Sequence, residues 1–250
     1  MLKRIIPSLL LRGGRLVKGA AFADHRDAGS PSTTARVHDA QGADELVLLD
    51  IDASREGRDP DFASFAAVAR ACFMPLTVGG GIASLDVAHR CLEAGADKLC
   101  LTSTALASPA LIGQLAHVFG AQAVVLGVDV VRTPAGRLVY DHRTHRPVAS
   151  PSWDEWLRRG VGEGAGEVRL LAVDREGRRT GFDLDLLADA SACVDVPIIL
   201  EGGAGSLEHV AAALRAGADA VALGTMLVFS DNNIHKVKSF LRNAGLEMRL

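Results

Sequence analysis

The chain has 250 residues, a length that fits one large α/β domain or two small ones. Its hydrophobic fraction of 48% and its 26 glycines allow a large buried core with many tight turns. The net charge is −3 and the Arg and Lys residues are scattered, so we expect neither nucleic acid nor a membrane as a partner.

The four cysteines and eight histidines show no disulfide or metal-ligand spacing. The cysteines fall in apolar segments, which is typical of buried thiols in a reducing compartment. His142 and His145 come nearest to a cluster, but they stand in a polar turn, where we expect a solvated loop. We therefore expect no metal ion and no cofactor. The start is too short for a signal peptide and no apolar run approaches ~18 residues, which predicts a cytoplasmic protein.

Short apolar runs alternate with segments of helical periodicity along the whole chain. The expected strands are residues 4–10, 46–50, 76–78, 98–101, 123–128, 168–172, 198–200 and 220–223. The expected helices are residues 33–40, 62–72, 85–94, 109–119, 153–160, 184–193, 207–216 and 234–244. Eight such units fit a (β/α)8 TIM barrel, because near-continuous apolar strands are typical of a parallel sheet covered by helices. A doubly wound sheet is the alternative fold.

One pattern of apolar strand, glycine turn and serine N-cap occurs twice, 122 residues apart, from Gly80 to Gly202. Segments 14–17, 42–45, 48–49 and 94–97 recur at the same offset, as 136–139, 164–167, 170–171 and 216–219. We therefore expect one domain over residues 1–250, made of repeated half-barrels over residues 1–122 and 123–250. A doubly wound sheet does not explain why both halves carry the same loop.

Each glycine turn directs backbone N–H groups and a helix N-terminus at one spot, which suits a phosphate. Hydroxyls at the end of the following strand would complete each site. A plain tight turn is the alternative for a single copy, but two copies in register favour two anion sites on opposite sides of the barrel mouth. The residues predicted to form them are Gly80, Gly81, Thr102, Ser103, Gly202, Gly203, Gly224 and Thr225. The expected ligand is an elongated phosphorylated small molecule.

Proton transfer at the mouth requires acids or bases at the strand ends. Asp129 ends an apolar run, where burial would raise its pKa to suit proton transfer; an aspartate that caps a loop is the alternative. The end of strand one holds Leu10, which cannot move a proton. Asp50 and Asp174 are also strand-end carboxylates, expected to hold loops or to bind polar groups of the substrate.

Two long polar segments, residues 12–32 and 130–151, follow strands one and five on the face where barrels place their active sites. We expect loops there, and the glycines of the first segment suit a flexible lid or plain surface decoration. Lys18 in that segment would contact a phosphate, close the lid or be solvated.

Four charged residues, Arg4, Glu45, Lys98 and Glu167, start strands at the opposite, N-terminal end of the barrel. Two cations and two anions that converge on the barrel axis would form a ring around an opening. Spacing alone favours isolated ion pairs that close the barrel bottom.

Taken together, these segments resemble the HisF family, the cyclase subunits of imidazole glycerol phosphate synthase, over the whole chain. The matching pieces are residues 3–7, 14–19, 26–29, 42–46, 76–82, 94–98, 202–205 and 249–250. The resemblance implies a barrel of the ribulose-phosphate-binding type whose N-terminal face binds a HisH-like glutaminase. It also implies that the charged ring is the gate through which ammonia enters, and it adds Gly177 to the substrate loop.

The sequence departs from the family at the catalytic pair, since Asp129 matches one aspartate and Leu10 replaces the other. Glu201 stands before the second glycine pair, where its charge would repel a phosphate unless it points away. The segments around Leu10, 48–55 and 72–75 look more like HisF-like paralogues of surface-polysaccharide pathways.

These departures favour a subunit that conducts ammonia for acetamidino modification of a nucleotide-linked sugar, together with a sugar amidotransferase. The alternative is a true cyclase of histidine biosynthesis, which converts a phosphoribulosyl substrate and ammonia to imidazole glycerol phosphate and AICAR. A phosphosugar-binding scaffold without catalysis is the third hypothesis.

Overall fold

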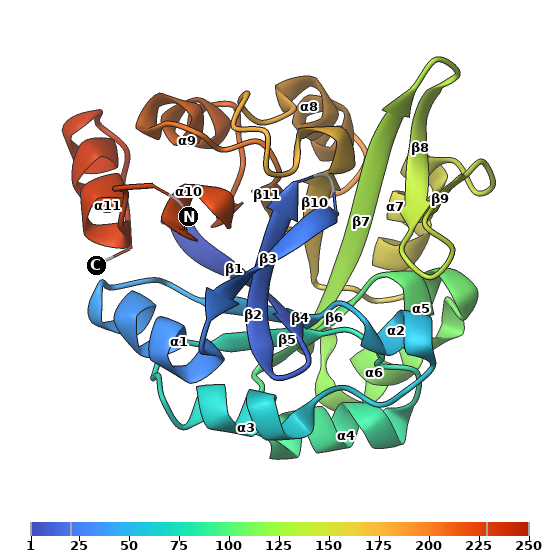
Figure 1. Cartoon of the computed structure of the whole chain (residues 1–250). Coiled ribbons are helices and arrows are strands. Elements are labelled where there is room, and N and C mark those ends of the chain that lie inside the picture. Colours follow the sequence, from blue (N-terminus) through green and yellow to red (C-terminus); the bar gives the residue numbers. More distant parts are fainter. Residues whose placement is uncertain (1, 21, 229, 250) are drawn as a thin grey trace.

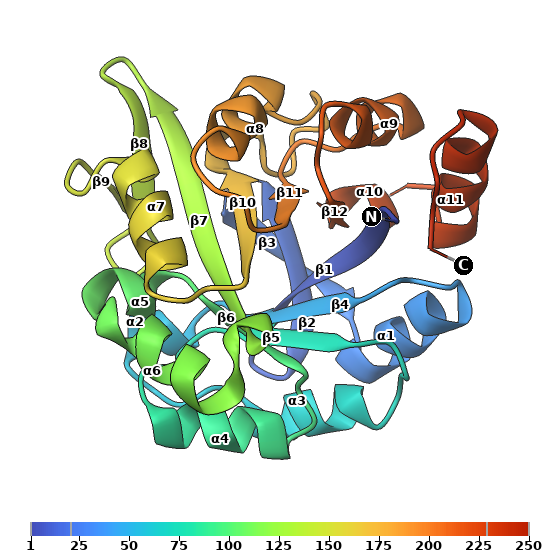
Figure 2. The same ribbon diagram turned by 180° about the vertical axis from the view of Figure 1, so that it is seen from behind.

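The computed structural model, which describes residues 2–20, 22–228 and 230–249, is a closed barrel of eight parallel strands inside a layer of helices (Figures 1 and 2). The barrel strands are β1 (Arg4–Arg12), β4 (Leu46–Asp50), β5 (Leu76–Gly79), β6 (Lys98–Leu101), β7 (Val124–Thr133), β10 (Glu167–Ala172), β11 (Ile198–Glu201) and β12 (Ala220–Leu223). β12 pairs with β1, Arg4 opposite Ala220, and this pairing closes the barrel. The predicted (β/α)8 barrel is confirmed, and the doubly wound alternative is wrong.

The helices connect successive strands on the outside of the barrel. They are α1 (Pro31–Ala40), α2 (Ala53–Glu56), α3 (Phe62–Ala69), α4 (Leu85–Glu93), α5 (Ser103–Ala107), α6 (Ala110–Phe119), α7 (Trp153–Gly162), α8 (Leu184–Ser191), α9 (Leu207–Arg215), α10 (Thr225–Val228) and α11 (Ile234–Asn243), with short 3-10 turns η1 (Ala121–Ala123) and η2 (Val173–Arg175). As predicted, Ser84 and Ser206 cap α4 and α9, and each accepts a backbone N–H of the first turn. Across the described ranges, no helix is long and apolar enough to span a membrane.

The two long polar segments form antiparallel ribbons, and the prediction that they are loops was wrong. After β1, the chain folds back as β2 (Arg15–Ala20), which pairs with β1 and with β3 (Ala23–Gly29). After β7 it folds back as β8 (Gly136–Asp141), which pairs with β7 and with β9 (Arg146–Val148). β1 and β7 extend beyond the barrel, and β2 and β8 pair with the backbone groups of these extensions. Figure 1 shows β2 and β3 across the barrel and β7 with β8 as a tall ribbon.

The inward side chains fill the barrel in layers, because alternate residues of each strand point to the axis. Charged side chains lie at the N-terminal end, and an apolar layer lies above them. Further charged and polar side chains lie at the C-terminal ends of the strands. The apolar layer consists of Ile6, Val47, Ile199, Ala220 and Ala222.

The repeated Ala-Gly-Ala-Asp segments form equivalent hydrogen bonds in the two halves of the barrel. Asp97 accepts the backbone N–H of Leu76 at 2.8 Å, and Asp219 accepts that of Ile198 at 3.0 Å. Each aspartate therefore satisfies the first free donor of the preceding strand. This equivalence supports the two half-barrels, which stay a prediction.

Gly80 has a backbone that excludes a side chain. Its φ is +96°, and a Cβ there would lie 1.9 Å from the carbonyl oxygen of Asp50. We expect Gly80→Ala to lower the free energy of unfolding by more than about 3 kcal/mol, because a backbone collision adds to left-handed strain. Gly42 is the matched control, since its φ is +74° with open space around it; Gly42→Ala should cost about 1–2 kcal/mol. Denaturant unfolding measures both, and equal losses would contradict the collision.

Candidate active site

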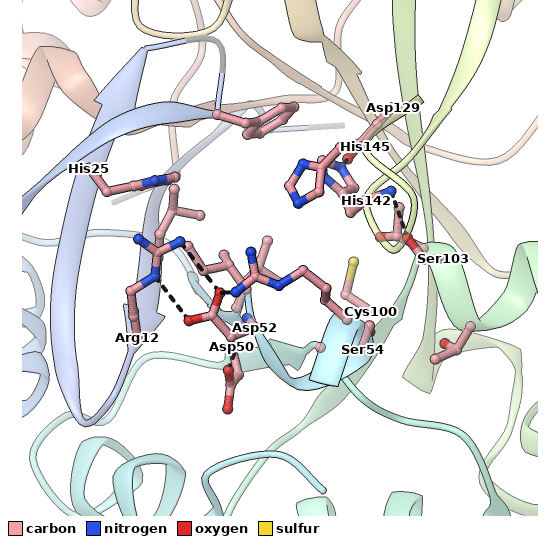
Figure 3. Close-up of a pocket in the computed structure, with 18 of the residues that line it drawn as sticks. Arg12, His25, Asp50, Asp52, Ser54, Cys100, Ser103, Asp129, His142 and His145 are labelled. Atoms are coloured by element: carbon pink, nitrogen blue, oxygen red, sulfur yellow. Dashed lines mark hydrogen bonds and ion pairs between the residues drawn. The ribbon is translucent and has the colours of Figure 1, made fainter. Parts of the chain in front are cut away.

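A cavity of about 820 Å³, counting its open mouth, lies at the C-terminal ends of the strands in the first half of the chain (Figure 3). It gathers predicted residues from both halves: Asp50, Gly80, Thr102, Ser103 and Asp129. Leu10 also lines it, so the residue near the end of β1 faces the same space as Asp129. The structure thus brings the first predicted anion site and the predicted acid–base position together.

Asp129 binds two side chains that sequence reasoning did not connect with it. Its carboxylate accepts from Nε2 of His142 and from Nη1 of Arg169, the latter at 3.3 Å. Burial opposes ionisation of this carboxyl, but the charges and hydrogen bonds of His142 and Arg169 outweigh that cost and lower the pKa of Asp129. The expectation of a raised pKa was therefore wrong. Both donors to the Asp129 carboxylate are side chains, so these bonds do not support the alternative that Asp129 caps a loop.

Arg169 is the central cation of this end of the barrel. Its side chain points inward from β10, is almost fully buried, and donates from Nε to Glu201. Burial alone would lower its pKa, but Glu201 and Asp129 raise it, so the guanidinium stays charged. Glu201, whose charge was expected to repel a phosphate, lines the second cavity but is paired with Arg169, which it shares with Asp129. The only signal for Arg169 in the sequence is a single basic residue within an apolar strand.

His142 lies in the turn between β8 and β9, so the expected polar turn is present, but His142 itself is half-buried and not solvated. Its side chain is 25% exposed and lines the cavity, and its backbone N–H donates to Ser103 at 3.2 Å. Its ring meets the ring of Phe22 edge-on at 4.5 Å. His145 of the same ribbon also lines the cavity and is exposed.

A second, smaller cavity lies beside β11 and β12 and gathers the other predicted anion site. The predicted residues that line it are Lys18, Gly177, Gly202, Gly203, Gly224 and Thr225. Lys18 is buried and forms an ion pair with Glu176, which excludes a solvated surface position. Within the described ranges, the buried Oγ1 of Thr225 has no hydrogen-bond partner, so it is free to bind a ligand oxygen. Sequence reasoning missed Glu176 as the partner of Lys18.

Three predicted substrate-binding residues have their polar groups occupied by the protein. Asp50 accepts from Arg58 at 2.7 Å and from backbone N–H groups, so it holds the loop after β4. The backbone N–H of Gly81 donates to Ser54 at 2.8 Å. Asp174 accepts a backbone N–H of β7 at 3.2 Å and lines neither cavity. Of the two roles expected for Asp50 and Asp174, the bonds support loop holding.

The four charged residues at the N-terminal end form one closed ring. Arg4 binds Glu45 at 3.1 Å and also binds Glu167. Lys98 binds the same two carboxylates at 2.9 and 2.8 Å. Each cation thus touches both anions, and Thr77 donates to a remaining oxygen of Glu45 at 2.6 Å. The expectation of isolated pairs was wrong, because all four side chains meet at the barrel axis.

The ring is partly buried and electrically balanced. Burial would lower the pKa of Arg4 and of Lys98, but Glu167 and Glu45 raise both above their ordinary values. Both cations therefore stay charged at neutral pH. Lys98 is the most accessible member, with 21% of its side chain exposed.

No group of three or more His, Cys, Asp or Glu side chains within residues 2–20, 22–228 and 230–249 could hold a metal ion.

Comparison with known proteins places the chain near one set of relatives. The family model "Histidine biosynthesis protein" matches residues 4–233. The chain is 45% identical over 251 residues to "Imidazole glycerol phosphate synthase subunit HisF" of Gluconacetobacter diazotrophicus, covering 100% of this chain and 97% of the relative. It is 44% identical over 249 residues to the protein of that name from Frankia casuarinae, with 98% of each covered. The Exiguobacterium sibiricum protein of that name is 41% identical over 249 residues, with 100% of each covered.

Replacing Arg169 tests how much the buried charge cluster depends on it. We expect Arg169→Met to lower the free energy of unfolding by about 3–5 kcal/mol, because Asp129 and Glu201 lose their shared cation. Arg15→Met is the matched control, since Arg15 and Asp27 form an exposed pair; it should cost less than about 1 kcal/mol. Denaturant unfolding at neutral pH measures both. A loss for Arg169→Met no larger than that of the control would show that the cluster is not coupled.

Proposed function

The chain belongs to the histidine biosynthesis protein family, and from that premise we propose that it is the ammonia-using subunit of a glutamine-dependent synthase of the imidazole glycerol phosphate synthase type. A HisH-like glutaminase would bind the N-terminal face of the barrel and release ammonia there. The acceptor would bind at the C-terminal mouth. The product would be imidazole glycerol phosphate, which the names of the relatives give. The substrate would be the phosphoribulosyl compound that the family resemblance implies.

The observation that carries this proposal is the closed ring of Arg4, Glu45, Lys98 and Glu167. A barrel bottom needs only packing to be closed, and buried ion pairs are a costly way to achieve it. A balanced ring around the axis excludes water and ions while closed, and it can open when one member swings out. Lys98 is the most exposed member of the ring, so we propose that its side chain is the one that moves when the ring opens. Ammonia would then enter the apolar layer of the barrel as a neutral molecule.

The mouth suits an elongated ligand with a phosphate near each end. The first cavity presents Gly80, Thr102 and Ser103, and the second presents Gly202 with Thr225. Both lie at the C-terminal ends of strands, and each adjoins a glycine turn that precedes a helix. Lys18 would bind the second phosphate by exchanging Glu176 for the ligand, since both are anions.

The altered catalytic pair favours a second candidate acceptor. Leu10 leaves the mouth with one of the family's two aspartates, and Asp129 is already bound to Arg169 and His142. A barrel that only conducts ammonia would not need the pair. In that case the acceptor would be the N-acetyl group of a nucleotide-linked sugar, converted to an acetamidino group with the help of a sugar amidotransferase.

Complementation separates the two candidates. We expect the chain, expressed with its glutaminase, to restore growth of a histidine-requiring strain that lacks its own cyclase subunit. A strain given the Gly80→Ala variant of low stability serves as the negative control. If soluble protein accumulates without growth, the cyclase reaction is excluded. Formation of an acetamidino sugar in the same cells would then establish the second candidate.

The gate assignment is tested by the source of nitrogen. We expect Lys98→Ala to lower glutamine-driven product formation severalfold and to leave ammonium-driven formation unchanged. The reason is that the charged ring can no longer close and retain ammonia inside the barrel. Lys3→Ala is the control at the same end of the barrel, since Lys3 donates to the carbonyl of Ala218 at 2.7 Å and lies outside the ring. Product formation is measured with glutamine and with an ammonium salt. An equal loss from both sources, or the same loss in Lys3→Ala, would exclude the gate.

A further inference from the structure

We propose that His142 is the proton-transfer group at the mouth of this barrel and that Asp129 is the residue that positions it. The inference rests on the proposed function, because it assigns a residue to the addition of ammonia to the acceptor. It gives the mouth a second group beside Asp129, in the cavity where Leu10 has replaced an aspartate.

The fold holds the imidazole against Asp129 from several sides. The antiparallel pairing of β7 and β8 brings the residue after β8 back beside the end of the barrel strand. Nε2 of His142 then bonds to the carboxylate, and the backbone N–H of His142 is fixed on Ser103. The rings of Phe22 and Tyr140 meet the imidazole edge-on at 4.5 and 5.1 Å. The ring is therefore oriented before a ligand arrives, which is what an efficient proton acceptor requires.

The charges around the pair decide which ring nitrogen carries the proton. Arg169 helps to keep Asp129 ionised, and an ionised carboxylate can only accept a hydrogen bond. Nε2 of His142 must therefore carry the proton, which leaves Nδ1 with its lone pair. Nδ1 has no hydrogen-bond partner among the described residues, and the side chain borders the cavity. A carboxylate that fixes the tautomer of a histidine in this way is the arrangement that makes histidine a general base.

Three other titratable groups of the cavity wall, Asp50, Cys100 and His25, are less suited to the role. Asp50 is occupied by Arg58 and by backbone donors. Burial raises the pKa of the Cys100 thiol to about 11, so it stays protonated at neutral pH. His25 has a pKa lowered by burial, and Figure 3 shows it apart from Asp129, beside Arg12. Figure 3 shows His142 with Asp129 on the side away from Arg12 and Asp52.

The assigned step balances without another reactant. When ammonia attacks a carbonyl carbon of the acceptor, the C–N bond forms and the π electron pair of the C=O bond moves to oxygen. The nitrogen is then an ammonium that must lose a proton, and the oxygen is an alkoxide that must gain one. Nδ1 of His142 takes the first proton and returns it to the oxygen, so the imidazole ends neutral. Repeating the transfer allows the oxygen to leave as water.

Activity with an ammonium salt tests the role without the glutaminase or the gate. The probe is the phosphoribulosyl substrate of the proposed reaction. We expect His142→Gln to lose roughly 10²–10⁴-fold in kcat while its KM for that substrate changes little, because the lost group acts in proton transfer. The groups that face this imidazole are Asp129, Ser103, Tyr140 and, behind Asp129, Arg169.

Two further variants are measured together with His142→Gln. Asp129→Asn should lose a similar factor, since an amide can hold the wrong tautomer. His117→Gln on α6 is the control, because His117 is an exposed histidine that lines neither cavity, and it should leave kcat and the pH profile unchanged. Unchanged kcat in His142→Gln, with active wild-type protein, would overturn the role of His142 and leave the proposed function standing.

The ring nitrogens give a readout that does not depend on turnover. In nitrogen-15 NMR spectra at pH 8, we expect Nε2 of His142 to carry the proton and Nδ1 to be bare, with the two forms mixed in Asp129→Asn. A proton on Nδ1 in the wild type would overturn the inference. If the wild type forms no product from ammonium and the phosphoribulosyl substrate, the proposed reaction fails. The spectra still decide whether Asp129 positions His142.

Discussion

The cost of placing charge inside a closed barrel governs this structure. A charged side chain that points at the axis cannot reach bulk water, so it must find a partner within the same layer of inward residues. The layer at the N-terminal end meets this condition with two cations and two anions that contact one another in a ring. An apolar layer separates it from the second charged layer. Each end of the barrel is therefore a self-contained electrostatic unit.

The two charged layers differ in net charge, and the difference has chemical consequences. The ring is neutral, so it needs no ligand and serves as a closed floor. In the upper layer one cation, Arg169, faces two carboxylates, Asp129 and Glu201, which leaves a net charge of −1. That excess negative charge lies beside the imidazole of His142, which contacts Asp129. The upper layer is thus the end that can exchange protons.

Sequence reasoning found what depends on local pattern. All eight barrel strands and the longer helices follow from apolar runs and helical periodicity, and the starts of β4, β5 and β6 were predicted to the residue. The short helices α2, α5 and α10 were not predicted. The ribbons of β2, β3, β8 and β9 were missed because their sequences are polar and their pairing is set by how far β1 and β7 extend. The candidate site also divides into features set by local sequence pattern and features set by the tertiary fold. The ring residues contact one another and each glycine turn borders a cavity. The contacts of Lys18, Asp129 and His142, in contrast, join segments that only the tertiary fold brings near.

Leu10 is best understood together with Arg169 and His142. An aspartate at position 10 would face the same cavity as Asp129 and add a second uncompensated negative charge to a layer that already carries one. The apolar side chain avoids that repulsion and keeps water from one wall of the cavity. Under the role proposed for His142, a carboxylate and an imidazole would carry out the proton transfer that the family resemblance assigns to two carboxylates. On this view the substitution at the end of β1 changes which group carries the proton, and ammonia can still be used at the mouth.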